Sequence, residues 1–195
     1  MYGVYWLLKA LYHLDVDHGQ LALDILTQCD TNSYCHMLQN GATCVMEAWS
    51  REGKPNLSWS HPWASAPASA VAWGFFGIRP TAPGFKTFEC RPQPGNVSSA
   101  AITVPTLSGF IRASFRQWFS QQEKDGGSIV GIRLELHVPA NTMAKVCLPR
   151  FGLASTSLSI DGVAIGGFVQ RDYVCVDGVG SGVAARVISR GVTSV

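Results

Sequence analysis

Residues 41–49 place one carboxylate, that of Glu47, in an otherwise apolar segment that ends at Trp49. Burial beside an indole ring disfavours the charged form of a carboxyl group, so we expect the pKa of Glu47 to be raised unless a partner compensates. A carboxyl group whose pKa moves toward neutrality suits proton transfer. A glutamate near a tryptophan can equally be an ion-paired structural residue, and both interpretations stay open here.

A second segment whose side chains could take part in binding or catalysis follows a dozen residues later. In it, His61 is flanked by the indoles of Trp59 and Trp63. An imidazole can hydrogen-bond a hydroxyl group. Aromatic faces with polar groups between them suit a sugar, because its C–H faces stack while its hydroxyls need partners. The same rings could equally form part of a hydrophobic core. The pattern therefore makes Glu47 and His61 candidate residues of a carbohydrate site.

The elements that must position these side chains are helices, because apolar residues recur at three- and four-residue intervals through the first 77 residues. The first two helices are expected to form an antiparallel hairpin around a break at residues 15–19. Ser33 is expected to cap the third helix, and Pro62 to lie in the first turn of the fourth. The expected helices cover residues 2–12, 21–26, 33–41 and 62–77. Glu47 and His61 then lie in and at the end of the loop between the last two.

After residue 78 the helical period disappears, and Pro and Gly punctuate short runs of β-branched and aromatic residues. Residues 132–138 alternate strictly between apolar and polar side chains, as a strand with one wet face does. The expected strands cover residues 103–104, 110–115, 129–138, 143–148, 158–160, 173–176 and 183–188, with a turn at residues 125–127. The sequence predicts an α+β chain of two domains, helices over residues 1–77 and an antiparallel β-sandwich over residues 78–195.

Composition narrows the classes of function. The 195 residues include 15 Lys and Arg against 13 Asp and Glu, and 47% of them are hydrophobic, as in a folded protein. The basic residues are scattered, so no nucleic-acid partner is expected. No apolar run approaches the roughly 18 residues of a membrane span, so no membrane partner is expected. The first residues also lack the pattern of a signal peptide, and the localisation stays open.

The six cysteines contain no Cys-x-x-Cys pair and have no His at zinc-ligand spacing, so no metal site is expected. Without a signal peptide, we expect all six to be reduced thiols buried as small apolar residues. They are Cys29, Cys35, Cys44, Cys90, Cys147 and Cys175.

Several motifs stand in the same order as in a known enzyme family. They are Gly-Ala-Thr through Glu-Ala-Trp at residues 41–49, Lys-Pro-Asn-Leu-Ser-Trp-Ser-His-Pro-Trp at residues 54–63, Pro-Gly-Phe-Lys at residues 83–86 and Arg-Pro-Gln-Pro-Gly at residues 91–95. Together they resemble the C-terminal part of the α-L-rhamnosidases of glycoside hydrolase family 78. Residues 138–149 are similar to a hairpin of that family's C-terminal sandwich. The likeness fades over residues 166–195, whose role stays open.

The resemblance implies an (α/α)6 toroid closed by a jelly-roll-like sandwich, with only the last toroid helices in this chain. It implies hydrolysis of a terminal α-L-rhamnosyl residue with inversion, and a rhamnose-containing glycan or glycoside as the partner. Glu47 aligns with the general base and His61 with a histidine that lines the rhamnose pocket. Trp49 is expected to shape the site, and residues 54–56 to set only the shape of the loop. No cofactor is implied, because two carboxyl groups and water suffice.

Inverting hydrolysis also needs a protonated carboxyl group roughly 6.5–9.5 Å from the base. In the family this acid lies far upstream, and no acidic residue of the helical part matches its motif. Asp15 and Asp17 are expected to be solvated or capping residues of a turn. Glu52 shares a loop with Glu47 and is not expected to reach the other side of a bound sugar.

The expectation is therefore a piece of a rhamnosidase that is inactive alone. Its partners would be the missing N-terminal part of the enzyme, or a second copy that covers the exposed helical faces. Two alternatives stay open: a module that binds rhamnose-containing glycans without hydrolysing them, and a remnant without function.

Overall fold

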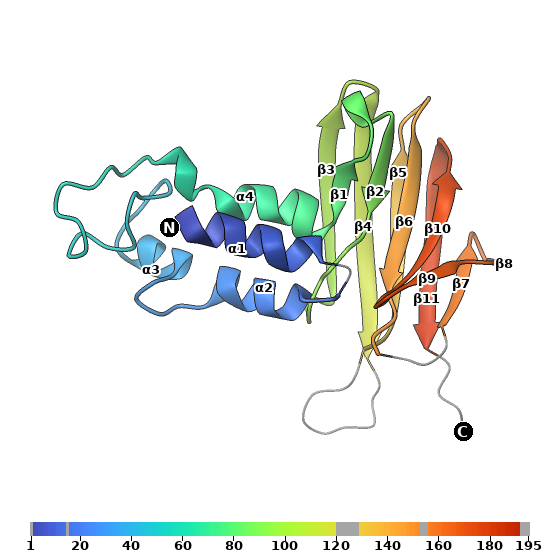
Figure 1. Ribbon diagram of the computed structural model, residues 1–195, viewed down its shortest axis with the longest axis horizontal. Coiled ribbons are helices and arrows are strands. Elements are labelled where there is room, and N and C mark those ends of the chain that lie inside the picture. Colours follow the sequence, from blue (N-terminus) through green and yellow to red (C-terminus); the bar gives the residue numbers. More distant parts are fainter. Residues whose placement is uncertain (1, 15, 120–128, 153–155, 192–195) are drawn as a thin grey trace.

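The computed structural model describes residues 2–14, 16–119, 129–152 and 156–191. In this part of the chain the helical region ends at Phe75 and the strands begin at Ile78, with one short 3-10 turn (Pro83–Phe85) between the first two strands. Figure 1 shows α1 (Tyr2–His13), α2 (Gly19–Thr27) and α4 (Ala66–Ala70) lying side by side at one end of the β structure. Helix α3 (Tyr34–Gln39) and a long loop lie at the far end of these helices. The predicted α+β organisation is confirmed, while the turn expected at residues 125–127 lies outside the described residues.

Helices α1 (Tyr2–His13) and α2 (Gly19–Thr27) form the predicted hairpin. Helix α3 (Tyr34–Gln39) begins after Ser33, whose Oγ accepts a hydrogen bond from the backbone N–H of His36 at 3.0 Å. None of the described helices is long and apolar enough to cross a membrane.

The fourth predicted helix is divided into three short pieces. They are a 3-10 turn (Pro62–Ala64), α4 (Ala66–Ala70) and a π-helical turn (Val71–Phe75). Pro67 lies in the first turn of α4. Because proline has no N–H to donate to the preceding turn, a continuous helix from Pro62 cannot form, and the helix starts afresh.

The strands form two sheets. The five-stranded sheet has the order β1 (Ile78–Pro80), β2 (Thr87–Cys90), β6 (Met143–Pro149), β10 (Tyr173–Val179), β9 (Phe168–Gln170). The six-stranded sheet has the order β3 (Ser99–Thr106), β4 (Gly109–Phe119), β5 (Ile129–Val138), β11 (Gly182–Gly191), β7 (Thr156–Ile160), β8 (Val163–Ile165). The described strand pairs are antiparallel except for β2 and β6, which run parallel. Each of the seven predicted strands is found. Sequence reasoning missed β1, β2, β8 and β9, which at three or four residues are too short to show an alternation.

The predicted alternation in β5 is confirmed. Ile132, Leu134 and Leu136 are fully buried, while Arg133 and Glu135 between them lie on the other, partly exposed face. One continuous core joins the sheets to the helical part. At the junction the rings of Phe75 and Phe76 pack on Phe115 of β4, with centroid distances of 5.6 and 5.5 Å.

The junction also depends on one glycine. Gly77 has a φ of 64°, and a Cβ atom added there would lie 1.9 Å from the carbonyl oxygen of Arg91. Only glycine allows two backbone segments to approach this closely with a positive φ. The same contact brings β1 beside the extension of β2, where Gln93 Nε2 donates to the carbonyl oxygen of Tyr12 in α1 at 2.9 Å.

The prediction that all six cysteines are reduced is wrong for four of them. Cys29 pairs with Cys35, and Cys147 pairs with Cys175. The register of β6 and β10 sets Cys147 opposite Cys175, which residue spacing alone does not reveal. The connection between α2 and α3 brings Cys29 close to Cys35, and residue spacing does not reveal this pair either.

The other two cysteines are free thiols. Cys90 is buried as predicted, and burial raises its pKa to about 12, so it stays protonated. Cys44 is also unpaired but is exposed rather than buried.

Candidate active site

Two backbone hydrogen bonds join the segments that sequence analysis selected. The N–H of Glu47 donates to the carbonyl oxygen of Ser58 at 2.9 Å, and the N–H of His61 donates to that of Val45 at 2.8 Å. Beneath them lies a small core whose buried members are Met37, Ala42, Met46 and Leu57. Because Met46 points into this core, the adjacent Glu47 side chain is left toward the surface. The long loop is therefore packed from below.

The carboxylate of Glu47 is held by two donors. Lys54 Nζ forms an ion pair with Oε1, and the backbone N–H of Ser58 donates to Oε2 at 2.9 Å. The hydrogen bond from Lys54 is the largest influence on the pKa of Glu47, followed by that from Ser58, and together they lower it despite partial burial. Lys54 and the Ser58 N–H are thus the partners that compensate for the burial of the Glu47 carboxyl group. Glu47 is therefore ionised at neutral pH, the form that can accept a proton, but its lowered pKa makes it a weaker base than a free glutamate rather than one moved toward neutrality.

Lys54 has a larger role than the sequence indicated. The motif match was expected to set only the shape of the loop, yet the Lys54 ammonium group contacts the carboxylate directly. A separation of seven residues within a loop carries no periodic signal, so sequence reasoning had no means of pairing it with Glu47.

His61 belongs to an aromatic cluster that also contains Tyr2 and Trp63. Its Nε2 lies 3.0 Å from the hydroxyl of Tyr2, and the ring of Tyr2 packs against Trp63 at 4.8 Å between centroids. The imidazole and the indole of Trp63 lie 5.9 Å apart. Among the described ring contacts, Trp59 makes none with His61. Tyr2 falls in the first helix expected from the sequence, over residues 2–12, and was missed as a site residue.

Trp49 follows Glu47 by two residues in the same loop. Its indole packs edge-on against Tyr34 at 5.3 Å, which fixes the ring's orientation. Trp49, Glu47, Tyr2 and Asn32 line a hollow of about 320 Å³. A second, more apolar hollow of about 570 Å³ lies beside it. Its lining residues include Tyr2, Tyr5, Trp6, Pro62 and Trp63. Tyr2 takes part in both, so the two hollows adjoin.

Glu47 is the sole carboxylate among the described residues that line the first hollow. Hydrogen bonds from its own backbone N–H and from Ser50 lower the pKa of Glu52, which is therefore ionised rather than a proton donor. Asp17 Oδ1 accepts the N–H of Gly19 at 2.9 Å, but the N-cap residue of α2 is His18, and burial raises the pKa of Asp17, so it is not simply solvated. Asp15 lies outside the described residues.

No cluster of His, Cys, Asp or Glu suited to a metal ion occurs in the described part of the chain.

Replacing Lys54 by Met should raise the pKa of Glu47, because the ion pair is lost while the Ser58 N–H remains. An NMR titration of the Glu47 carboxyl carbon measures this directly. Since the folded-state pKa lies below the unfolded one, the ion pair stabilises the fold above the unfolded pKa, and this contribution disappears as the pH falls through the folded pKa. The variant's loss of stability should therefore shrink on acidification. Lys54→Arg, which keeps the charge, is the control; an unchanged Glu47 pKa in Lys54→Met would contradict the assignment.

Comparison with known proteins agrees with this architecture. Residues 1–73 match the bacterial α-L-rhamnosidase six-hairpin glycosidase domain, and residues 77–157 match the bacterial α-L-rhamnosidase C-terminal domain. A search among curated proteins found no match.

Two solved structures share the fold over nearly the whole chain. The α-L-rhamnosidase from Dictyoglumus thermophilum is 17% identical and covers 96% of this chain with a TM-score of 0.72. The Streptomyces avermitilis α-L-rhamnosidase complexed with L-rhamnose is 23% identical and covers 95% with a TM-score of 0.67. This chain spans 20% and 17% of the length of those two proteins.

The helices, the loop that holds the ion-paired carboxylate of Glu47 and the β-sandwich that follows define part of a six-hairpin glycosidase with its C-terminal β domain. Because consecutive domains of one enzyme match consecutive parts of the sequence, the particular family follows. The chain belongs to the bacterial α-L-rhamnosidases.

Proposed function

We propose that this chain carries the general base of an inverting α-L-rhamnosidase and that Glu47 is that base. The observation that carries the proposal is the pairing of the Glu47 carboxylate with Lys54 and the Ser58 N–H, which keeps it ionised at the wall of a hollow. The substrate class is a terminal α-L-rhamnosyl residue. The L-rhamnose complex of the Streptomyces avermitilis enzyme supports rhamnose as the recognised sugar.

In the proposed reaction a water molecule lies between Glu47 and the anomeric carbon. The carboxylate takes a proton from the water as its oxygen attacks that carbon, and the bond to the leaving oxygen breaks on the opposite face, which inverts the configuration. A protonated carboxyl group must supply the proton to the leaving oxygen. The charge of Lys54 stabilises the ionised form of Glu47 before the reaction. The ion pair between the two side chains must weaken as Glu47 accepts the proton.

The sugar would be held by the aromatic cluster. The imidazole of His61 and the hydroxyl of Tyr2 can exchange hydrogen bonds with sugar hydroxyls, while Trp49 and Trp63 offer apolar surface to its C–H faces. The contact between Tyr2 and His61 at 3.0 Å orients the imidazole before a ligand arrives. Trp49 is positioned by Tyr34 at the wall of the hollow, next to the base.

We further propose that the 195 residues alone do not complete the reaction. Glu47 has no carboxyl partner among the described residues of its hollow, and the chain spans about a fifth of the solved rhamnosidases. The division into a helical domain, residues 1–77, and a sandwich domain, residues 78–195, belongs to the same proposal. The further helices of a six-hairpin domain would contribute the acid.

Exposed apolar side chains support this proposal. Trp6, Leu38 and Trp63 are 64%, 70% and 69% exposed, although all belong to the helical part. Apolar surface of this kind is favourable to bury, at about 25 cal/mol per Å². We propose that the remaining helices of the catalytic domain cover it, and that a second copy substitutes for them when the chain is alone.

The purified chain should release no rhamnose from an aryl α-L-rhamnoside above the buffer rate, yet it should bind L-rhamnose saturably. His61→Ala should weaken that binding by about tenfold, in line with one or two lost hydrogen bonds. Calorimetric titration and a reducing-sugar assay measure the two properties.

His13→Ala, a replacement of an exposed histidine in the last turn of α1, is the matched control and should leave L-rhamnose affinity unchanged. Turnover that is lost in Glu47→Gln would overturn the claim that the chain is incomplete. Binding that survives His61→Ala unchanged would overturn the sugar site.

Binding without hydrolysis is also what a rhamnose-binding module would show, and the aromatic cluster around His61 is the observation in its favour. The Glu47 variant separates the two once the chain is joined to the rest of a six-hairpin domain, where hydrolysis can be measured. A module has no use for an ionised base beside the sugar, so Glu47→Gln would not affect its role, whereas the base proposal requires that carboxylate in any preparation that hydrolyses.

A further inference from the structure

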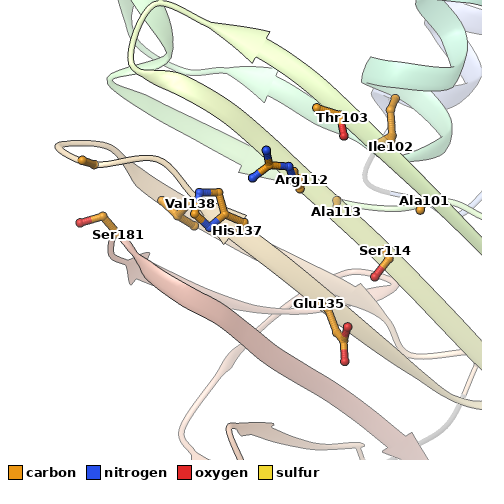
Figure 2. Close-up of a pocket in the computed structure, with 11 residues that line it drawn as sticks. Ala101, Ile102, Thr103, Arg112, Ala113, Ser114, Glu135, His137, Val138 and Ser181 are labelled. Atoms are coloured by element: carbon orange, nitrogen blue, oxygen red, sulfur yellow. The ribbon is translucent and has the colours of Figure 1, made fainter.

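A third hollow, separate from the two beside Glu47, lies on the outer face of the six-stranded sheet, across β3, β4 and β5. Its volume is about 850 Å³. The polar side chains among its lining residues are Thr103, Arg112, Ser114, Glu135, His137 and Ser181. Figure 2 shows Arg112 and His137 close together on neighbouring strands, with Ser114 and Glu135 further along the same two strands. Ala101 and Ala140 also line the hollow, and their small side chains leave it room.

The strand register explains why these groups converge. Arg112 is the direct cross-strand partner of both Thr103 and His137, and Ser114 is that of Glu135. Side chains of such partners leave the sheet on the same face with Cβ atoms roughly 4.5–5.5 Å apart. The guanidinium of Arg112 and the imidazole of His137 therefore stand side by side over the sheet.

Among the described residues, no carboxylate pairs with Arg112 or His137. In the part of the chain that the structure describes, the guanidinium of Arg112 contacts only the ring of Phe110, 5.6 Å from its centroid. His137 makes no hydrogen bond or ion pair with these residues. Glu135 is already paired with Arg133 at 3.0 Å. Within the described residues, the nitrogen groups of Arg112 and His137 thus face the hollow without a protein acceptor.

The surrounding face carries an excess of positive charge. On β4 and β5 the side chains that alternate with the buried ones include three arginines, one histidine and a single carboxylate. They are Arg112, Arg116, Arg133, His137 and Glu135. A face with this charge attracts anions, and arginine in particular binds a carboxylate through two parallel N–H bonds.

We infer that this hollow binds a carboxylated saccharide. The carboxylate of a uronic acid would bridge Arg112 and His137, and the hydroxyls of Thr103, Ser114 and Ser181 would pair with hydroxyls of the sugar. Phe110, on the same face of β4 and 52% exposed, offers a ring for the C–H face of a neighbouring sugar. A hollow of this size accommodates more than one sugar unit.

This site is independent of the Glu47 loop. Figure 1 places the loop between α3 and α4 at one end of the molecule and strands β3 to β5 at the other. The inference therefore does not rest on the proposed hydrolysis. A protein of this family with both sites would hold an acidic polymer at the sandwich while the helical part acts on its rhamnosyl units.

Calorimetric titration of the 195-residue chain with trigalacturonic acid tests the inference, with its methyl-esterified form as the matched ligand that lacks the charge. We expect saturable binding of the acid, at least about tenfold weaker binding of the ester, and weakening with salt. Arg112→Gln should reduce affinity for the acid at least about tenfold, and Arg112→Lys should reduce it less.

Arg116→Gln is the matched control, since Arg116 lies on the same strand and face but outside the hollow. It should change affinity less than about twofold. Glu47→Gln should leave the binding unchanged, so that failure of the base proposal and failure of this one are separate results. Equal binding of acid and ester, equal losses in Arg112→Gln and Arg116→Gln, displacement by an equal concentration of sulfate, or no binding of the acid would each overturn the inference.

Discussion

Truncating Phe76 to alanine is expected to lower the free energy of unfolding by about 3–5 kcal/mol. Phe76 is 2% exposed and lies where the π-helical turn passes into β1. Its ring contacts Phe75 at 5.3 Å and Phe115 of β4 at 5.5 Å, so it belongs at once to the helical part and to the sandwich. Removing it leaves a cavity at the contact between them, where surrounding side chains cannot collapse without moving both.

Urea unfolding followed by far-ultraviolet circular dichroism measures this loss. Phe110→Ala is the control, because Phe110 is half exposed on the outer face of β4 and should cost less than about 1 kcal/mol. Equal losses in the two variants would mean that the junction is not the shared core that the packing of Phe75, Phe76 and Phe115 indicates.

Opening the Cys147–Cys175 disulfide should have the next largest effect. The two residues are separated by 28 positions, so the bond closes a long loop in the unfolded chain, and loop entropy of this length corresponds to about 3–4 kcal/mol. Both side chains are fully buried beside Tyr173, so replacement of both by alanine also removes packed atoms. The double variant Cys147→Ala, Cys175→Ala is therefore expected to unfold at clearly lower urea concentration.

The second disulfide provides the comparison. Cys29 and Cys35 are separated by only six positions, so the double alanine variant at these residues should cost less, about 2 kcal/mol. In excess dithiothreitol the unmodified chain should lose the stability that both bonds contribute. An effect of the Cys147 and Cys175 replacement no larger than that of the short loop would contradict the assignment of the long one.

The sequence predicted the features that repeat or that belong to a motif. Apolar spacing placed the helical hairpin, and the strict alternation of residues 132–138 predicted which face of β5 is buried. The motif order placed Glu47 and His61, and the two backbone hydrogen bonds between their segments show that the loop brings those segments together.

What the sequence could not predict depends on contacts between residues that no period links. The hydroxyl of Tyr2 meets His61 across 59 positions, and Cys147 meets Cys175 through strand register. Lys54 reaches Glu47 because of the loop's own path. The same is true of the charge state of Glu47, which pattern reasoning tied to burial beside Trp49 but which hydrogen bonds control.

The parallel pairing of β2 with β6 has a consequence for the order in which the chain folds. Strands β3, β4 and β5 lie between them in sequence but belong to the other sheet. During synthesis the edge of β2 that pairs with β6 therefore stays unpaired until more than fifty further residues have emerged. The meander of β3, β4 and β5 forms within that interval. Non-local closure of this kind is slow, and unpaired edges invite association between nascent chains. We therefore expect yield on expression to respond more to temperature and chaperones than the equilibrium stability of the finished protein would indicate.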